Sequence, residues 1–278
     1  MGQNDIAEKI LADYNDVFAD IVNVLLFDGR KVIAEDSLET VKDKSQYRAL
    51  DGKIHEQERD VVKLAKDKGV QLALFGFEHQ TKHDKDMPFR VIGYDGAAYR
   101  SQILHGAARY PVITLVLNFE MKRWDCGKSL HDVIDTREEL LPYFSDYKIN
   151  VFDIAFLEPE QVEKFQSDFK IVAEYFVQKR TKNDYVPRAC EIRHVDEILK
   201  LMTTLTRDYR YEAQIGKVEK EGVTMCEILD KIVEQGRAEE RAALIQKLKA
   251  AGMLPLDFDV KDLDDYPPEK STLSKIKL

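Results

Sequence analysis

The chain has 278 residues with a formal net charge of −9, and 44% of its residues are hydrophobic. This composition is that of an ordinary globular protein, either one sizeable domain with appendages or two small domains, and it excludes a disordered chain. The acidic balance argues against a protein that coats DNA, and no apolar run reaches the ~20 residues of a membrane-spanning helix.

The cysteines and the amino terminus indicate a cytoplasmic protein. Cys126, Cys190 and Cys226 are odd in number and far apart. This pattern predicts reduced thiols, and neither a disulfide framework nor a zinc site. The amino-terminal residues lack a basic segment followed by an apolar one, so no signal peptide is expected.

The first half of the chain is predicted to form a helix followed by a β-hairpin. Apolar residues at helical spacing run through residues 6–27, and Asp28-Gly29 ends the pattern. Val32-Ile33 suits a short strand, and residues 37–57 are polar and ambiguous. Two strands are expected at 59–64 and 70–77, because Asp67-Lys68-Gly69 between them suits a hairpin connection.

The middle of the chain is predicted to add helices and parallel strands. Met87-Pro88 begins a helix that continues to about residue 107, and residues 110–119 read as a central strand buried on both faces. Further elements are expected as a strand at 149–157, a helix from Pro159 to about 176 and a helix at 191–209. The order helix, strand, strand, strand, helix, strand predicts an α/β (α+β) fold with a mixed sheet flanked by helices.

The first domain is expected to span residues 1–210, and a linker, a helix and a polar tail are expected to follow it. Residues 211–224 are polar and contain Gly216 and Gly222, so they read as a linker. Residues 225–251 carry an apolar stripe at helical spacing, which predicts a C-terminal helix that packs on its own domain or forms a homo-oligomer with a copy of itself. Residues 252–278 are predicted to be a loose polar tail.

A pair of acidic residues is the main candidate for chemistry. Glu78 and Gln80 are two residues apart, so they point to the same side at the end of one predicted strand. If Asp60 lies on the neighbouring strand, its carboxylate and that of Glu78 converge into an oxygen site of the kind that holds Mg²⁺ beside a phosphodiester. On spacing alone, two solvated acids at strand ends are the more common arrangement. The apolar run before Glu78, and Gly76 within it, favour a site.

Other polar side chains near this pair have simpler interpretations. His79 and His83 are four residues apart, but the sequence lacks the glutamate of a zinc-protease motif, and both read as loop histidines. Asp16 and Asp20 share one face of the first helix, where they offer a third carboxylate or merely surface charge. Lys63 is three residues after Asp60, an odd number, so on a regular strand its side chain should point to the opposite face from that of Asp60 unless a bulge intervenes.

The segment that follows the candidate pair is the most basic part of the chain. Residues 79–124 hold seven basic and four acidic side chains, a balance of +3, whereas residues 1–60 have a balance of −6. This distribution permits a phosphate-binding face without requiring one. The amide of Gln80 can contact an attacking water or a phosphate, but it cannot stabilise charge or move a proton as a lysine can.

An ordered set of phrases in the chain resembles one family. The phrases are Asn23-Val24-Leu25-Leu26-Phe27, Arg59-Asp60-Val61-Val62-Lys63, Gly76-Phe77-Glu78-His79-Gln80-Thr81, Met87-Pro88-Phe89-Arg90-Val91-Ile92-Gly93-Tyr94, Tyr110-Pro111-Val112-Ile113-Thr114-Leu115-Val116-Leu117 and Asp146-Tyr147-Lys148-Ile149-Asn150. Together they cover roughly residues 10–210 and resemble the Rpn-type recombination-promoting nucleases, or putative transposases, of the PD-(D/E)XK nuclease superfamily.

The resemblance implies a restriction-endonuclease-like core and a divalent-metal-dependent DNA endonuclease linked to recombination or mobile elements. It implies Asp60 and Glu78 as catalytic ligands of Mg²⁺, with Mn²⁺ or Ca²⁺ as alternatives. The resemblance also implies Gln80 as a third catalytic residue, at the position where the superfamily usually has lysine. For the acidic residue that the superfamily often places on its first helix, the candidate is Asp20 or Asp16.

A mechanism follows as a hypothesis. Asp60 and Glu78 would hold the metal, which would lower the pKa of a water and neutralise charge on the phosphate. Gln80 would orient this water, and Lys82 and Arg90 would hold flanking phosphates of the DNA. A second hypothesis is a catalytically inactive nuclease-like module for DNA binding or protein interaction, which the missing lysine at position 80 and the acidic balance favour. A third is a structural protein without a nucleic-acid partner.

Overall fold

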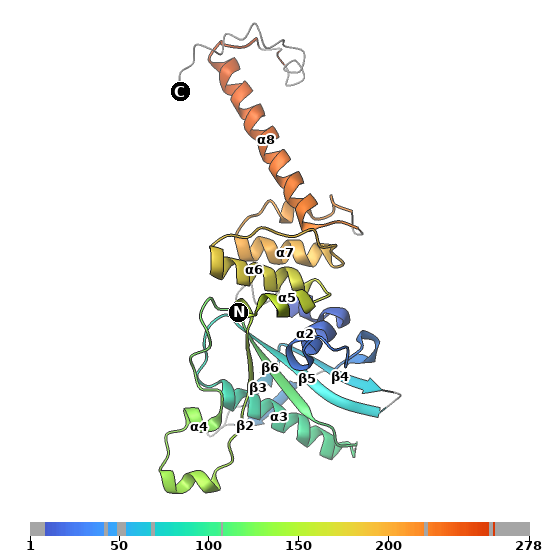
Figure 1. The fold of residues 1–278 in the computed structure, drawn as a ribbon, viewed down its shortest axis with the longest axis vertical. Helices are drawn as coiled ribbons and strands as arrows, with labels where there is room; N and C mark the ends of the chain where they lie inside the picture. The colour runs from blue at the N-terminus through green and yellow to red at the C-terminus, as the bar shows by residue number, and fades with distance from the viewer. Residues whose placement is uncertain are drawn as a thin grey trace. The chain divides into compact units, whose positions relative to one another are not determined.

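The computed structural model describes residues 9–41, 44–48, 54–67, 70–106, 108–219, 222–255 and 258 (Figure 1). The chain divides into two compact units, Met1–Met225 and Cys226–Leu278. The strands are β1 (Leu38–Thr40), β2 (Lys44–Arg48), β3 (Ile54–Glu58), β4 (Val61–Asp67), β5 (Val70–Gln80), β6 (Val112–Asn118) and β7 (Asn150–Asp153). The α-helices are α2 (Asn15–Phe27), α3 (Met87–Leu104), α4 (Leu130–Val133), α5 (Pro159–Lys164), α6 (Phe169–Lys182), α7 (Val195–Thr206) and α8 (Met225–Ala250), and short 3₁₀ helices lie at η1 (Glu35–Ser37), η2 (Glu138–Tyr143), η3 (Ile154–Phe156) and η4 (Glu212–Gln214).

A mixed five-stranded sheet forms the centre of the first unit. Its order is β1-β4-β5-β6-β7. The pairs β1–β4 and β4–β5 are antiparallel, and the pairs β5–β6 and β6–β7 are parallel. Strands β2 and β3 pair with each other in a separate antiparallel ribbon. The predicted α/β (α+β) fold with a mixed sheet flanked by helices is therefore confirmed.

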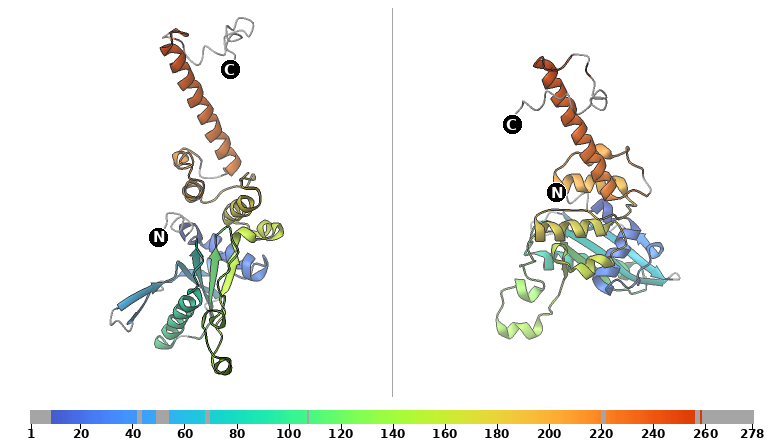
Figure 2. Two further views of the ribbon diagram at one scale, coloured as in Figure 1. Left: turned by 90° about the vertical axis from the view of Figure 1, so that its left-hand side faces the viewer. Right: turned by 45° about the horizontal axis from the view of Figure 1, so that its top comes forward.

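Helices cover both faces of this sheet (Figures 1 and 2). On one face, Ala98 of α3 packs with Val62, Leu74 and Val112 of three neighbouring strands. On the other face, Phe18 of α2 stacks on Phe77 of β5 at a ring-centroid distance of 4.2 Å, and Phe119, which follows β6, packs against Phe169 and Phe176 of α6. Strand β6 is thus buried between two helical layers, which explains its continuous apolar sequence.

The first predicted helix is divided in the structure. A helical turn covers residues 9–12, Tyr14 is extended with φ −70° and ψ 134°, and α2 starts at Asn15. The helix ends as predicted, because Asp28 and Gly29 both adopt positive φ angles.

The strand expected at Val32-Ile33 is wrong. The backbone N–H groups of Val32 and Ile33 both donate to Asn23 Oδ1 over 2.9 Å. A buried side chain of α2 therefore occupies the donors that a strand would use in a sheet.

The hairpin and the following helix agree with the expected pattern. Asp67 of β4 pairs with Val70 of β5, while Lys68 and Gly69 between them lie outside the described residues. Helix α3 begins at Met87 and has Pro88 in its first turn.

The helix predicted from Pro159 to about residue 176 is two helices. Phe165, which directly follows α5, is extended with φ −65° and ψ 134°, and α6 begins only at Phe169. The backbone N–H groups of Gln166 and Ser167 donate to the side chain of Asp20, and this tertiary contact stabilises the break. The strand expected at 149–157 ends at Asp153, where η3 follows.

The C-terminal part of the chain contains the long helix α8, close to the predicted bounds of 225–251. Residues 210–224 include the buried side chains Tyr211, Gln214, Val218 and Val223. The division of the chain at a 211–224 linker stays a prediction, and most of the 252–278 tail lies outside the described residues. Within the described part, no helix is both long enough and apolar enough to cross a membrane.

Candidate functional site

Asp60 and Glu78 meet where β4 begins and β5 nears its end. The strand register pairs Val61 with Phe77, and the Asp60 N–H donates to the Phe77 carbonyl over 3.2 Å. The Asp60 Oδ2 atom accepts a hydrogen bond of 2.8 Å from the N–H of His79, the residue next to Glu78. The structure therefore brings these two predicted site residues together.

The Glu78 carboxylate is fully buried. Burial, and next the negative charge of Asp60, raise the pKa of Glu78 to about 8, although the cations Arg90, Lys9 and Arg59 act in the opposite direction. One oxygen, Oε2, lies 2.8 Å from Arg90 Nη2. No residue that the structure describes donates a hydrogen bond to the other oxygen, Oε1. A buried carboxylate oxygen without a donor is a strong acceptor for a cation.

Each member of the acidic pair contacts a cationic side chain, Asp60 that of Lys9 and Glu78 that of Arg90. Lys9 Nζ is 2.6 Å from Asp60 Oδ1, and Arg90 Nη1 is 3.0 Å from Asp84 Oδ2 while its Nη2 contacts Glu78. Sequence reasoning missed Lys9, because it lies before α2 and no local spacing relates it to Asp60. Arg90, expected to hold a phosphate, is tied to two carboxylates, and 36% of its side chain is exposed.

Gln80 is the last residue of β5, two positions after Glu78 and therefore on the same strand face. Its backbone carbonyl accepts a hydrogen bond of 2.9 Å from the N–H of Phe119, and its side chain is half-buried. Lys82 is exposed on the loop that follows the strand. Gln80 can reach solvent beside the acidic pair without being locked into the core.

Lys63 faces away from the acidic pair, as the alternation of strand side chains predicts. Its Nζ atom lies 3.1 Å from Asp13 Oδ1 and donates to Thr40 Oγ1 over 3.0 Å. The same ammonium group lies 5.8 Å from the centre of the Phe18 ring on α2. Lys63 is therefore a structural residue of the α2 face of the sheet.

A buried ion pair lies next to the site. Arg59, which directly precedes Asp60, contacts Asp95 Oδ1 of α3 through Nη2 at 2.7 Å. Asp95 also accepts hydrogen bonds from Thr114 Oγ1 and from the Tyr147 hydroxyl. The close approach expected at Gly76 is made by this arginine, because a Cβ atom there would lie 2.5 Å from Arg59 Cδ.

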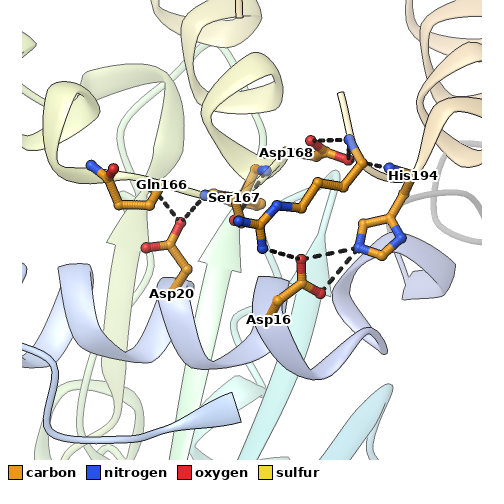
Figure 3. A network of polar contacts seen from close by, with 8 residues as sticks. Asp16, Asp20, Gln166, Ser167, Asp168 and His194 are labelled. Carbon is orange, nitrogen blue, oxygen red and sulfur yellow. Dashed lines mark hydrogen bonds and ion pairs between the residues drawn. The ribbon is translucent and has the colours of Figure 1, made fainter. Parts of the chain in front are cut away.

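The two acids of the first helix are bound elsewhere, as Figure 3 shows. The Asp20 Oδ2 atom accepts hydrogen bonds from the N–H groups of Gln166 and Ser167 over 2.8 and 2.7 Å. Asp16 Oδ1 lies 3.0 Å from His194 Nε2. The structure thus uses both acids to connect α2 with the segment before α6 and with the start of α7, and it does not bring them to Asp60 and Glu78.

Comparison with known proteins identifies a family and no individual relative. The family model described as "Putative transposase, YhgA-like" matches residues 38–210, more than half of the chain. No curated protein and no solved structure matches the chain. The matched region contains Asp60, Glu78 and Gln80, and it confirms the resemblance carried by the ordered phrases. The chain therefore belongs to the YhgA-like putative transposases, a family whose name implies a role connected with mobile elements.

Proposed function

We propose that this protein is a divalent-metal-dependent DNA endonuclease of the PD-(D/E)XK type, acting in recombination or on mobile elements. One observation carries the proposal: Asp60 and Glu78 converge from adjacent strands, and Glu78 Oε1 is buried with no hydrogen-bond donor among the described residues. A buried carboxyl oxygen without a donor, in a group whose pKa is raised, is typical of a functional site.

The donor set fits a hard cation. Two carboxylates offer oxygen ligands, which Mg²⁺ prefers, and Mn²⁺ or Ca²⁺ accepts the same ligands. Lys9 contacts Asp60 and Arg90 contacts Glu78 in the structure, and a divalent cation would compete with these two contacts and favour the ionised form of Glu78. When bound, Mg²⁺ lowers the pKa of a coordinated water and offsets charge on the phosphate.

The protein's own residues have separate tasks in this proposal. Gln80 orients the attacking water through its amide, which cannot itself carry charge. Lys9 supplies, from another element, the positive charge that position 80 does not provide. Lys82 and Arg90 hold phosphates of the DNA beside the scissile bond, since both side chains are at least partly exposed.

Plasmid nicking in Mg²⁺ tests the assignment. We expect Asp60→Asn and Glu78→Gln to lose about 100-fold or more of the wild-type rate, because each removes charge that stabilises the transition state. The matched control is Asp67→Asn, which changes an exposed acid at the other end of β4 and should keep full activity. Equal rates in all four proteins would refute the nuclease assignment.

The role of Lys9 has its own test. Lys9→Met should lower the nicking rate strongly, whereas Lys9→Arg should retain part of it because the positive charge remains. Wild-type activity in Lys9→Met would show that the ammonium group only neutralises Asp60 in the metal-free protein.

A catalytically inactive DNA-binding module is the second candidate. It is favoured by the ion pairs of Lys9 and Arg90, which already neutralise the acids, and by glutamine at position 80. This alternative predicts DNA binding that weakens with salt, but no cleavage and no rise in melting temperature with Mg²⁺ or Mn²⁺. The nuclease proposal predicts salt-dependent DNA binding, cleavage, and a rise in melting temperature with Mg²⁺ or Mn²⁺.

We also propose that the protein acts in the cytoplasm and assembles through α8. Its three cysteines, all within the described residues, form no disulfide. On α8, Val233 and Leu244 are both exposed, and their spacing of eleven residues leaves them about 20° apart around the helix. Light scattering of the wild type and of Leu244→Glu would detect a homo-oligomer that depends on this stripe.

A further inference from the structure

Four polar side chains gather on the two loops that follow β5 and β6. These strands are parallel and pair Gln80 with Asn118 at their ends, so the loops after them leave the same edge of the sheet. The loop after β5 carries His83, and the loop after β6 carries Glu120, Asp125 and Cys126. The fold thereby brings together residues that lie 42 positions apart, as His83 and Asp125 do.

Three of these side chains place potential metal ligands close to one another. His83 Nδ1 lies 2.5 Å from Asp125 Oδ1, and the Cys126 thiol lies 3.8 Å from the same oxygen. One ligand atom from each of the three residues lies within 4.8 Å of the other two. A tetrahedral zinc with bonds of about 2.0–2.3 Å has ligand atoms roughly 3.5 Å apart, so only small side-chain movements are needed.

We infer that His83, Asp125 and Cys126 form a binding site for a zinc-like transition-metal ion. An imidazole nitrogen and a thiolate sulfur select such an ion over Mg²⁺ or Ca²⁺, which prefer oxygen ligands. Three protein ligands leave a fourth position for water, and the Asp125 side chain is 75% exposed, so solvent reaches the site. The cysteine spacing argued against a zinc site, because only one thiol contributes and His83 comes from another loop.

The surroundings of His83 fit this assignment. Its other ring nitrogen, Nε2, lies 3.0 Å from Glu120 Oε2, although the two atoms do not have hydrogen-bond geometry. A small rotation would let this carboxylate orient a metal-bound imidazole, which is the usual role of a carboxylate at the second nitrogen. The buried Trp124 ring lies 5.2 Å from the imidazole and limits its movement. Cys126 is partly buried against the cluster that contains Val91 and Trp124.

The site is chemically distinct from the acidic pair and does not rest on the nuclease proposal. A structural connection still exists, because the residue after His83 is Asp84, which binds Arg90, the cation that contacts Glu78. A metal at His83 would join the two loops and hold Asp84 in place. Its role is that of a clamp at the edge of the candidate active site.

Titration of the reduced full-length protein with Co²⁺ tests the site. We expect one equivalent to produce the absorption bands of a tetrahedral cobalt–thiolate complex, with quenching of Trp124, the only tryptophan of the chain. Excess Zn²⁺ should abolish both signals. Cys126→Ser should remove the thiolate band, whereas the matched control Cys190→Ser should keep it. Glu120→Gln should weaken binding about 10- to 100-fold.

Two further variants keep the result interpretable. Asp125→Asn alters an exposed side chain, so the fold should be retained while Co²⁺ affinity falls at least about 10-fold. The double variant Asp60→Asn/Glu78→Gln should retain the thiolate band, because the acidic pair contributes no sulfur. Absence of the band in the wild type would overturn the inference, and so would unchanged Co²⁺ binding in Cys126→Ser or Asp125→Asn.

Discussion

Replacing Gly76 by alanine tests whether the buried ion pair between Arg59 and Asp95 supports the candidate site. A Cβ atom at position 76 would lie 2.5 Å from Arg59 Cδ and 3.2 Å from its Nε, both closer than packed atoms normally approach. Arg59 is buried, and its Nη2 is held 2.7 Å from Asp95 Oδ1. We expect the arginine to make room by moving away from this partner.

The expected loss follows from the charges that would be separated. Breaking a buried ion pair costs about 3–5 kcal/mol, because one charge is left without compensation. Alanine has an intrinsic advantage over glycine within a strand of roughly 0.5–1 kcal/mol. The net destabilisation of Gly76→Ala should therefore be about 2–4 kcal/mol, a large part of the stability of a typical domain.

Urea denaturation of the wild type and two glycine variants provides the measurement. Gly96→Ala is the matched control, since a Cβ atom at this position in α3 meets no atom within 4 Å. That variant should gain up to about 1 kcal/mol, as alanine does within a helix. If Gly76→Ala is as stable as the wild type, Arg59 has an alternative position and the pair does not support β4. An equal rise in melting temperature in Gly76→Ala and Gly96→Ala would likewise show that the Arg59–Asp95 pair does not support β4.

Three other predictions concern single side chains. Because the Glu78 pKa is raised from 4.5 to about 8, the folded protein holds a proton in this range that the unfolded chain has released. The stabilisation is therefore complete below about pH 4.5 and is lost as the pH rises towards 8, by about 1.4 kcal/mol per pH unit. Glu78→Gln should remove this slope in denaturation experiments with EDTA, and an unchanged slope would contradict the assignment. Lys63→Met should keep nicking activity and change the free energy of unfolding by no more than about 1 kcal/mol, because its partner Asp13 is exposed and stays hydrated. A folded but inactive variant would place Lys63 in catalysis. Asp20→Ala should cost about 1–3 kcal/mol in thermal or urea unfolding, because two backbone N–H groups lose a charged acceptor. If its stability is unchanged and its nicking activity lost, Asp20 is a site acid after all.

The local part of the fold could be predicted because its signals are local. The alternation around Lys63 and Glu78, the pairing of β4 with β5 and the apolar run of β6 each depend on residues within a few positions. The same reasoning failed where a distant side chain decides the backbone. Asn23 accepts hydrogen bonds from the N–H groups of Val32 and Ile33. Asp20 accepts one from the N–H of Gln166, where the helix expected after Pro159 is interrupted.

From the amino-acid sequence alone, the central strands of the sheet and the family could be predicted, and so could the proximity of Asp60 and Glu78 once a hairpin joins their strands. The residues that surround the pair depend on tertiary packing. Lys9 reaches Asp60 from the helical turn before α2, Arg90 reaches Glu78 from α3, and His83 meets Cys126 across two loops. Such contacts depend on how separate elements pack, and no spacing along the chain encodes them.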